Sequence, residues 1–371
     1  MVTGFASTLG GPFYLETGDV EYFRLDVTPI DATIQTILWT SSDPGVISVA
    51  RVARMDRSVL AVTGPDSEVR VTAVGLGSAT LTATAQGSGG VEVSATVNIT
   101  VSLHRPGDTI DVSFGGVTLT MAWIPGGTFT VGGETGWNAG SMPAHEVTLT
   151  EGFWMGIHTV TQDQWEALMP WNPSFFNGDS RRPVEQVTWF DAVYFANALS
   201  EDLGLDPVYD ITVITGGSGS QITNATVTAD FSRNGFRLPT NAEWERAARA
   251  GTTTHWSFGD NPTDLHYYAW YDVNSGGMTQ PVGTRRANAW GLYDTHGNVS
   301  EWVWDWFTGY TATPEIDPRG PDAPDSGLSA SRVVRGGSWF AQADFTRSAF
   351  RFNFNPGHLV DGLQGFRLVR P

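Results

Sequence analysis

The sequence predicts an all-β sandwich over residues 1–104, followed by an α+β domain over residues 105–371. In the first part, apolar and polar residues alternate in short runs between turns, which is typical of an antiparallel sandwich. The second part has a few capped helices among many Gly, Pro, Asn and Asp residues. It also holds 14 of the 15 tryptophans, and a loop-rich chain needs such aromatic residues to fill its core.

Four alternating runs mark expected strands of the first part: residues 21–27 (EYFRLDV), 69–74 (VRVTAV), 79–85 (ATLTATA) and 91–101 (VEVSATVNITV). Trp39 lies in an apolar stretch and is expected in the sandwich core. The sequence from WTSSDPGVISVA to ATLTATA resembles bacterial Ig-like domains of the group 2 type. This resemblance implies a spacer or adhesin module of a bacterial surface protein.

Three helices are predicted in the second part. Residues 161–169 begin with Thr161 as N-cap, and residues 189–204 end at Gly204. Residues 240–251 carry a capping box, in which Glu243 follows the N-cap Thr240 by three positions, and Gly251 ends the helix. The rest of this part is predicted to be loop and short strand.

The formal net charge of −18 argues against nucleic acid or an anionic membrane surface as the main partner. No run approaches the roughly 20 apolar residues of a membrane helix, so we expect no membrane insertion by this chain. The first residues lack the basic and apolar regions of a signal peptide, so no leader is visible.

A series of phrases then gives the second part a family resemblance. They include MAWIPGGTFTVGG from Met121, FRLPTNAEWERAARAG from Phe236, GLYDTHGNVSEWVWDW from Gly291, RVVRGGSW from Arg332 and the final GFRLVRP. Together they resemble the formylglycine-generating, or sulfatase-modifying-factor, family over residues 121–371. The resemblance implies the C-type lectin fold of the formylglycine-generating-enzyme type.

Catalytic members of that family are oxidases that bind copper through a pair of cysteines, because Cu(I) prefers thiolate ligands. This chain has no cysteine, so copper is excluded and we expect no enzymatic activity. A related branch uses histidine-ligated iron, but the seven histidines here are scattered. The spacing of the carboxylates Glu243, Glu245, Glu301 and Asp305 does not distinguish an acid/base pair from helix caps and core ion pairs.

The resemblance also implies a structural calcium ion within LYDTHGNVSEW. Its ligands would be the carboxylates of Asp294 and Glu301 and the backbone carbonyls of Gly297 and Val299. Calcium prefers six to eight oxygen ligands, which such a turning loop supplies. The alternative is a metal-free loop, in which Asp294 accepts from backbone amides and Glu301 pairs with an arginine.

The end of the chain, residues 332–371, resembles the variable region of the variable proteins of diversity-generating retroelements, which carry the same RGGSW…R…R…GFR order. In those systems adenines in template Asn codons are randomised, so the resulting codons never encode Lys, Glu, Met or Trp. Residues 340–364, which we call the insert, contain none of these four. We call residues 336–339 (GGSW) and 365–367 (GFR) the frame.

We expect Arg347 and Arg351 to point inward and the residues around them to form a ligand-binding surface. Aromatic rings with Asn, His and Asp are typical of adaptable binding surfaces. The alternative is burial of the Phe rings in the core. The expected ligand-binding residues are Phe340, Ala341, Asp344, Phe345, Phe350, Phe352, Asn353, Phe354, Asn355, His358, Leu359, Val360 and Asp361.

The resulting hypothesis is a non-catalytic ligand-binding protein that is secreted or displayed on the cell surface. Its partner would be a protein ligand or another molecule of a host or microbial surface. A carbohydrate-binding, lectin-like module is the first alternative, and a sulfatase-modifying oxidase is the second.

Overall fold

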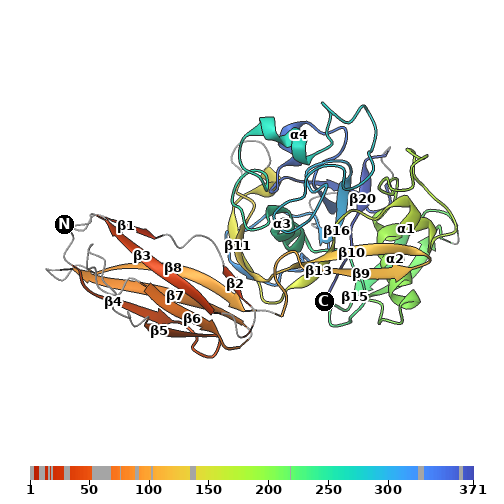
Figure 1. Ribbon diagram of the computed structural model, residues 1–371. Coiled ribbons are helices and arrows are strands. Elements are labelled where there is room, and N and C mark those ends of the chain that lie inside the picture. Colours follow the sequence, from red (N-terminus) through yellow and green to blue (C-terminus); the bar gives the residue numbers. More distant parts are fainter. Residues whose placement is uncertain are drawn as a thin grey trace. The chain divides into compact units, whose positions relative to one another are not determined.

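The computed structural model describes residues 4–7, 13–15, 17, 20–28, 34–51, 68–75, 77–87, 92–101, 103–133, 139–217, 219–324, 330–358 and 362–371 (Figure 1). The chain folds as two compact units, Met1–Arg105 and Pro106–Pro371. This division lies one residue after the position predicted from the sequence. Among the described residues, no helix has the length and apolar character needed to cross a membrane.

The N-terminal unit contains two four-stranded sheets, in the orders β1-β3-β6-β5 and β2-β8-β7-β4. All strand pairs are antiparallel except the parallel pair β2 and β8. The strands are β1 (Gly4–Ser7), β2 (Phe13–Leu15), β3 (Val20–Thr28), β4 (Ile34–Ser41), β5 (Ile47–Arg51), β6 (Glu68–Ala73), β7 (Gly77–Gly87) and β8 (Glu92–Val101).

Both sheets of this unit contribute to one hydrophobic core. Ile47 and Val69 from one sheet and Leu81 and Ile99 from the other are fully buried. The four predicted alternating runs fall on β3, β6, β7 and β8, because alternation with period 2 places one set of side chains on the inner face. The predicted core position of Trp39 is confirmed.

The C-terminal unit contains four sheets, ordered β21-β13-β10-β9, β11-β12-β17, β14-β15 and β19-β18-β16-β20. Its strands are β9 (Thr109–Phe114), β10 (Val117–Ile124), β11 (Gly127–Val131), β12 (His145–Leu149), β13 (Phe153–Gly156), β14 (Tyr209–Thr215), β15 (Asn224–Ala229), β16 (Ser300–Trp306), β17 (Glu315–Ile316), β18 (Arg332–Arg335), β19 (Arg351–Phe354), β20 (Gln364–Phe366) and β21 (Val369–Arg370). The insert contributes β19 to the same sheet as β20, which carries the start of the second frame segment, and β18 ends directly before Gly336 of the frame.

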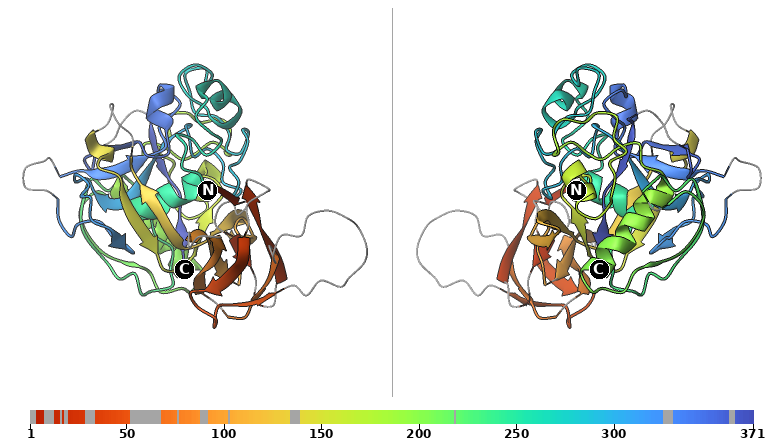
Figure 2. Two further views of the ribbon diagram at one scale, coloured as in Figure 1. Left: turned by 90° about the vertical axis from the view of Figure 1, so that its left-hand side faces the viewer. Right: turned by 90° about the vertical axis from the view of Figure 1, so that its right-hand side faces the viewer.

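The helices of this unit follow their capping signals. They are α1 (Gln162–Glu166), α2 (Trp189–Asp202), α3 (Asn241–Arg249) and α4 (Leu265–Tyr268), with the 3-10 helices η1 (Ala139–Ser141), η2 (Pro262–Asp264) and η3 (Ala343–Thr346). The predicted capping box of Thr240 and Glu243 is present at α3. α2 runs along the outside of the unit (Figure 2). The prediction for α1 was too long, because the helix ends at Glu166 and residues 167–169 continue as turns.

Aromatic rings fill the main core of the C-terminal unit. Trp165 stacks on Phe195 with a centroid distance of 5.3 Å, and Phe366 meets Phe195 edge-on at 5.6 Å. Every described tryptophan of this unit is buried or half-buried. The prediction that these residues fill the core is therefore confirmed.

A fully buried ion pair joins the end of the chain to this core. Arg367 donates two hydrogen bonds to Glu301, from Nε to Oε2 and from Nη2 to Oε1, each 2.6 Å long. Trp244 of α3 also donates to Glu301 Oε2 (2.7 Å), and Arg367 donates to the carbonyls of Gly156 (3.1 Å) and Tyr293 (2.9 Å). One pair thus connects β16, β13, α3 and the loop before β16.

Substitution Arg367→Met tests the importance of this pair. It leaves Glu301 buried without its positive partner, so the free energy of unfolding should fall by roughly 3–5 kcal/mol. Chemical denaturation of the purified protein measures this change. Arg233→Met is the matched control, because Arg233 pairs with Asp210 at the surface, and its effect should be much smaller. Equal effects of the two substitutions would contradict the structural role assigned to Arg367.

Candidate functional site

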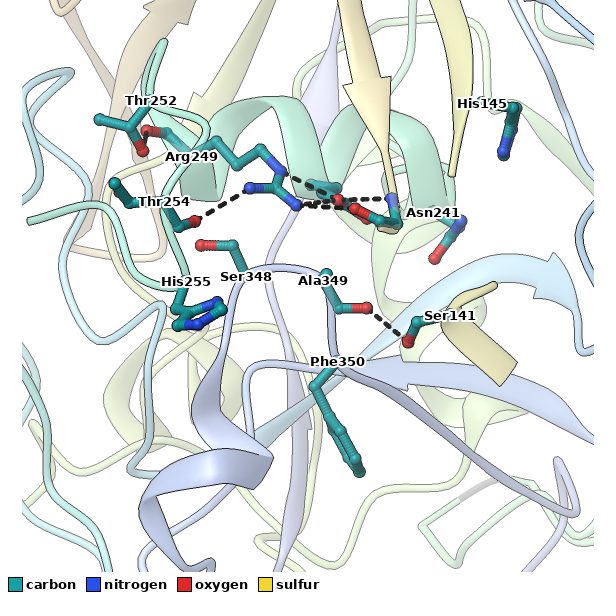
Figure 3. Close-up of polar contacts among 12 residues, drawn as sticks. Ser141, His145, Asn241, Arg249, Thr252, Thr254, His255, Ser348, Ala349 and Phe350 are labelled. Atoms are coloured by element: carbon teal, nitrogen blue, oxygen red, sulfur yellow. Dashed lines mark hydrogen bonds and ion pairs between the residues drawn. The ribbon is translucent and has the colours of Figure 1, made fainter. Parts of the chain in front are cut away.

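The backbone of the insert is held by side chains that bind its carbonyl groups. Arg335 donates to the carbonyls of Ser348 (2.9 Å), Ala349 (3.0 Å) and Phe350 (2.7 Å). Its fourth hydrogen bond goes to Glu245 Oε2 (2.6 Å), whose other oxygen accepts from Arg249 (2.8 Å). Ser141 donates to the same Ala349 carbonyl (2.8 Å; Figure 3). None of these contacts depends on which side chain the insert carries.

His296 fixes the neighbouring turn of the insert. Burial lowers the pKa of His296 to about 4, so its imidazole is neutral at neutral pH. Its Nδ1 lies 2.9 Å from the carbonyl of Thr346, and its Nε2 lies 2.9 Å from the hydroxyl of Ser257. The neutral tautomer that fits both partners donates from Nδ1 to Thr346 and accepts from Ser257 at Nε2.

The frame residues Gly337 and Trp339 also contact the insert backbone. Gly337 has a φ of +72°, and a Cβ atom there would lie 2.8 Å from the carbonyl oxygen of Phe345. The indole of Trp339 donates to the carbonyl of Gly362 (2.7 Å). The two ends of the insert are therefore fixed against the frame.

Of the two arginines of the insert, Arg351 contacts residues outside the insert and Arg347 pairs with a residue within it. Arg351 is buried, donates to the carbonyls of Gly140 and Thr308, and lies over the ring of Tyr310. Arg347 is half-buried and pairs with Asp344 at 2.7 Å. Both arginines thus stabilise the insert from within.

The expected ligand-binding residues differ in their exposure to solvent. The exposed rings are Phe340 (68%), Phe352 (50%) and Phe345 (36%), and Asn355 and His358 are exposed as well. The half-buried ones are Ala341, Asp344, Phe350, Asn353 and Phe354. Leu359, Val360 and Asp361 lie outside the described residues. The solvent-exposed members place aromatic and polar groups on the outer face of the insert.

Phe350 and Phe354, the two half-buried rings, make contacts that the exposed rings do not make. Phe350 precedes β19 and packs against Phe345 at 5.1 Å, and it points away from the polar cluster around Arg249 and Ser348 (Figure 3). Phe354 packs against Phe352 (5.2 Å) but also meets the core residue Trp302 edge-on (6.3 Å). Phe354 therefore contributes to the core as well as to the surface.

Phe175 is a candidate binding residue that the sequence patterns did not identify. It lies in the loop after α1 and is 65% exposed. A chain of ring contacts connects it to the insert, through Phe176 (4.9 Å) and Trp339 (5.2 Å) to Phe340 (5.5 Å). The only sequence signal was a pair of adjacent Phe residues within a polar loop, NPSFFNGD.

The four expected calcium ligands, Asp294, Gly297, Val299 and Glu301, are all buried. Glu301 uses both oxygens for Arg367 and Trp244, whereas Asp294 Oδ2 accepts from the backbone of Gly283 (2.8 Å) and Oδ1 has no partner. Glu301 thus pairs with an arginine, as the metal-free alternative expects, whereas Asp294 Oδ1 is left without a partner. The calcium site therefore stays a prediction.

Glu243 and Glu245, two acidic residues considered above as possible acid/base groups, serve in ion pairs and a helix cap. Glu243 accepts from Arg237 at both oxygens, each at 2.7 Å, and from the backbone of Thr240. Burial alone would raise the pKa of Glu245, but Arg249 and Arg335 hold it below its ordinary value. No cluster of three or more His, Cys, Asp or Glu side chains suited to a metal occurs in the described part of the chain.

Comparison with known proteins identifies the family of the C-terminal unit. Residues 116–371 match the Sulfatase-modifying factor enzyme 1-like domain. Among relatives, the chaperone protein LppX of Paenibacillus barcinonensis is 36% identical over 248 residues, which cover 60% of this chain and 81% of LppX. The formylglycine-generating enzyme of Streptomyces coelicolor is 39% identical over 150 residues, covering 36% of this chain and only 46% of the enzyme.

Two solved structures share the fold. Treponema denticola variable protein 1 superposes with a TM-score of 0.63 and 35% identity, covering 71% of this chain and 99% of that protein. PvdO from Pseudomonas aeruginosa has a TM-score of 0.55 and 25% identity over 72% of this chain and 99% of its own. These matches support the C-type-lectin-like fold expected for the second part. The chain belongs to the sulfatase-modifying factor enzyme 1-like family.

Proposed function

We propose that the C-terminal unit is a non-catalytic ligand-binding protein whose insert recognises a protein ligand. The main support for this proposal is the difference between the backbone of the insert and its aromatic side chains. Its backbone is fixed by Arg335, His296 and Trp339, whereas the rings of Phe340, Phe345 and Phe352 face solvent. An exposed aromatic surface on a fixed backbone is a typical binding site.

We further propose that the insert is the variable region of a diversity-generating retroelement protein. Support comes from the similarity to Treponema denticola variable protein 1 and from the absence of Lys, Glu, Met and Trp in residues 340–364. Outward side chains can change there without loss of the hydrogen bonds from Arg335, His296 and Trp339, because those bonds end on backbone carbonyls. A secreted or surface location, with an Ig-like N-terminal unit as spacer, belongs to the same proposal.

The oxidase alternative rests on relatives that are formylglycine-generating enzymes. It lacks chemical support, because the chain has no cysteine to bind Cu(I). Glu245, whose partner Arg335 binds the backbone of the insert, is itself bound to two arginines. A recognition role therefore fits the described residues better than catalysis.

The exposed rings should contribute little to folding. Phe352→Ala and Phe340→Ala should each change the free energy of unfolding by less than about 1 kcal/mol, because both rings are exposed. Trp339→Ala should cost at least about 2 kcal/mol, because it removes a ring packed on Phe176 and leaves the Gly362 carbonyl without its donor. Urea denaturation measures all three. A loss above about 3 kcal/mol for Phe352→Ala would assign this ring to the core.

The same rings should be necessary for recognition. The protein can be biotinylated at its N-terminus and tested by flow cytometry against a panel of bacterial and host cells. Replacing Phe340, Phe345 and Phe352 together by Ser should weaken binding to any recognised cell by at least about tenfold, because aromatic residues dominate binding energies. The matched control, Val213→Ser with Ile214→Ser, changes exposed apolar residues of β14 and should bind as the wild type does. Unchanged binding of the triple variant would refute the proposed surface.

The calcium prediction can be tested through Asp294. Burial raises the pKa of Asp294 to about 6, so ionisation of this group opposes folding, and the cost grows as the pH rises from about 4 to about 6 and is constant above that. Asp294→Asn should therefore increase stability by roughly 2 kcal/mol more at pH 7.5 than at pH 4.5. The control Asp230→Asn should show the opposite pH dependence, since hydrogen bonds from Ser232 lower the pKa of Asp230. A rise in Tm on adding calcium that Asp294→Asn abolishes would instead establish the metal site.

A further inference from the structure

A second candidate site lies in a cavity of about 490 Å³ in the C-terminal unit. Its walls come from β12, the start of α3, residues 305–321 and Arg351 of β19. Arg351 lines the cavity and is buried, whereas its neighbour Phe352 is exposed, because successive side chains of a strand point to opposite faces. The cavity is therefore separate from the exposed rings of the insert.

Asp305 supplies an enclosed carboxylate at one wall. Its Oδ2 accepts from the backbone N–H of Asn241 (2.7 Å), and its Oδ1 lies beside Gly320. Gly320 has a φ of +69°, and a Cβ atom there would lie 2.8 Å from Oδ1. Burial raises the pKa of Asp305 to about 6, so this group is mostly ionised at neutral pH. A side chain at position 320 would therefore collide with this carboxylate.

Asn241 supplies a buried acceptor whose partner is missing. Its side-chain nitrogen donates to the hydroxyl of Tyr310 (2.7 Å), which fixes the amide orientation. Its Oδ1 is buried and has no hydrogen-bond partner. Leaving such an atom unpaired costs free energy, so a ligand or water that donates to it is favoured. Tyr310 accepts from Asn241 and retains its own hydroxyl hydrogen for donation.

The charges around the cavity nearly balance. Asp305 and Glu315 are acidic, Arg351 and Arg319 are basic, and His145 lies 3.5 Å from Glu315 through Nε2. The two arginines would repel a cationic ligand, and the two carboxylates would repel an anionic ligand. A neutral ligand avoids both repulsions.

We propose that this cavity binds a small neutral ligand with several hydroxyl groups, of about the size of a monosaccharide. Hydroxyl groups both donate and accept, so one ligand can donate to Asn241 Oδ1 and Asp305 Oδ1 and accept from Tyr310. The volume lies within the ordinary range of roughly 300–1,000 Å³ for small-molecule sites. This proposal does not depend on the ligand of the insert.

Saturation-transfer-difference NMR on the full chain provides the test. The probes are D-glucose, D-galactose, D-mannose, N-acetylglucosamine and myo-inositol, with agmatine as a cationic and citrate as an anionic comparison. At least one neutral probe should bind with a dissociation constant in the micromolar to millimolar range, and more tightly than both charged probes. Lack of binding by every neutral probe at about 50 mM, or preference for a charged probe, would overturn the proposal.

The variant Gly320→Ala locates the binding. It places a methyl group against Asp305 and should weaken binding by at least about tenfold. The matched control is Gly204→Ala, since Gly204 has nearly the same φ of +68° but no atom within 4 Å of an added Cβ. Tyr310→Phe should also weaken binding, through loss of one hydroxyl. Equal binding by wild type, Gly320→Ala and Tyr310→Phe would show that the ligand lies elsewhere.

Discussion

The buried pair of Arg367 and Glu301 is the constraint on which the C-terminal unit depends. Two charges without solvent access are stable only when their hydrogen-bonding groups are matched, and here both oxygens of Glu301 and all three nitrogens of Arg367 have partners. These partners come from β16, β13, α3 and the loop at Tyr293. The last residues of the chain are therefore part of the core. The insert lies between β18 and the end of β20, and it contributes β19 to the same sheet.

The insert itself is stabilised by hydrogen bonds to its main-chain carbonyl groups. Arg335, His296 and Trp339 bind the carbonyls of residues 348–350, 346 and 362, and Ser141 adds a further contact at Ala349. Carbonyl groups are present whatever the side chain is. These hydrogen bonds fix the backbone of the insert, and its outward side chains are not needed for them.

Sequence patterns predicted the features that are local. The capping box of Thr240 and Glu243, the alternating strands of the N-terminal unit and the burial of the tryptophans follow from short-range periodicity and side-chain chemistry. Features formed by residues that lie far apart in the sequence could not be predicted from such patterns. Phe175 reaches the insert only through Phe176 and Trp339, and the cavity combines Asn241, Asp305 and Gly320 from three separate segments. The pairing of Glu301 with Arg367 is likewise a tertiary contact.

The close approach of Phe345 to Gly337 has an evolutionary consequence. Since the carbonyl of residue 345 occupies the space of a Cβ atom, any side chain at position 337 would displace the turn that carries Thr346. A mutation of Gly337 would therefore change the backbone of the insert, and with it the placement of its side chains. If the insert is a variable region, substitutions should therefore be tolerated at its outward positions but not at Gly337, a few codons upstream.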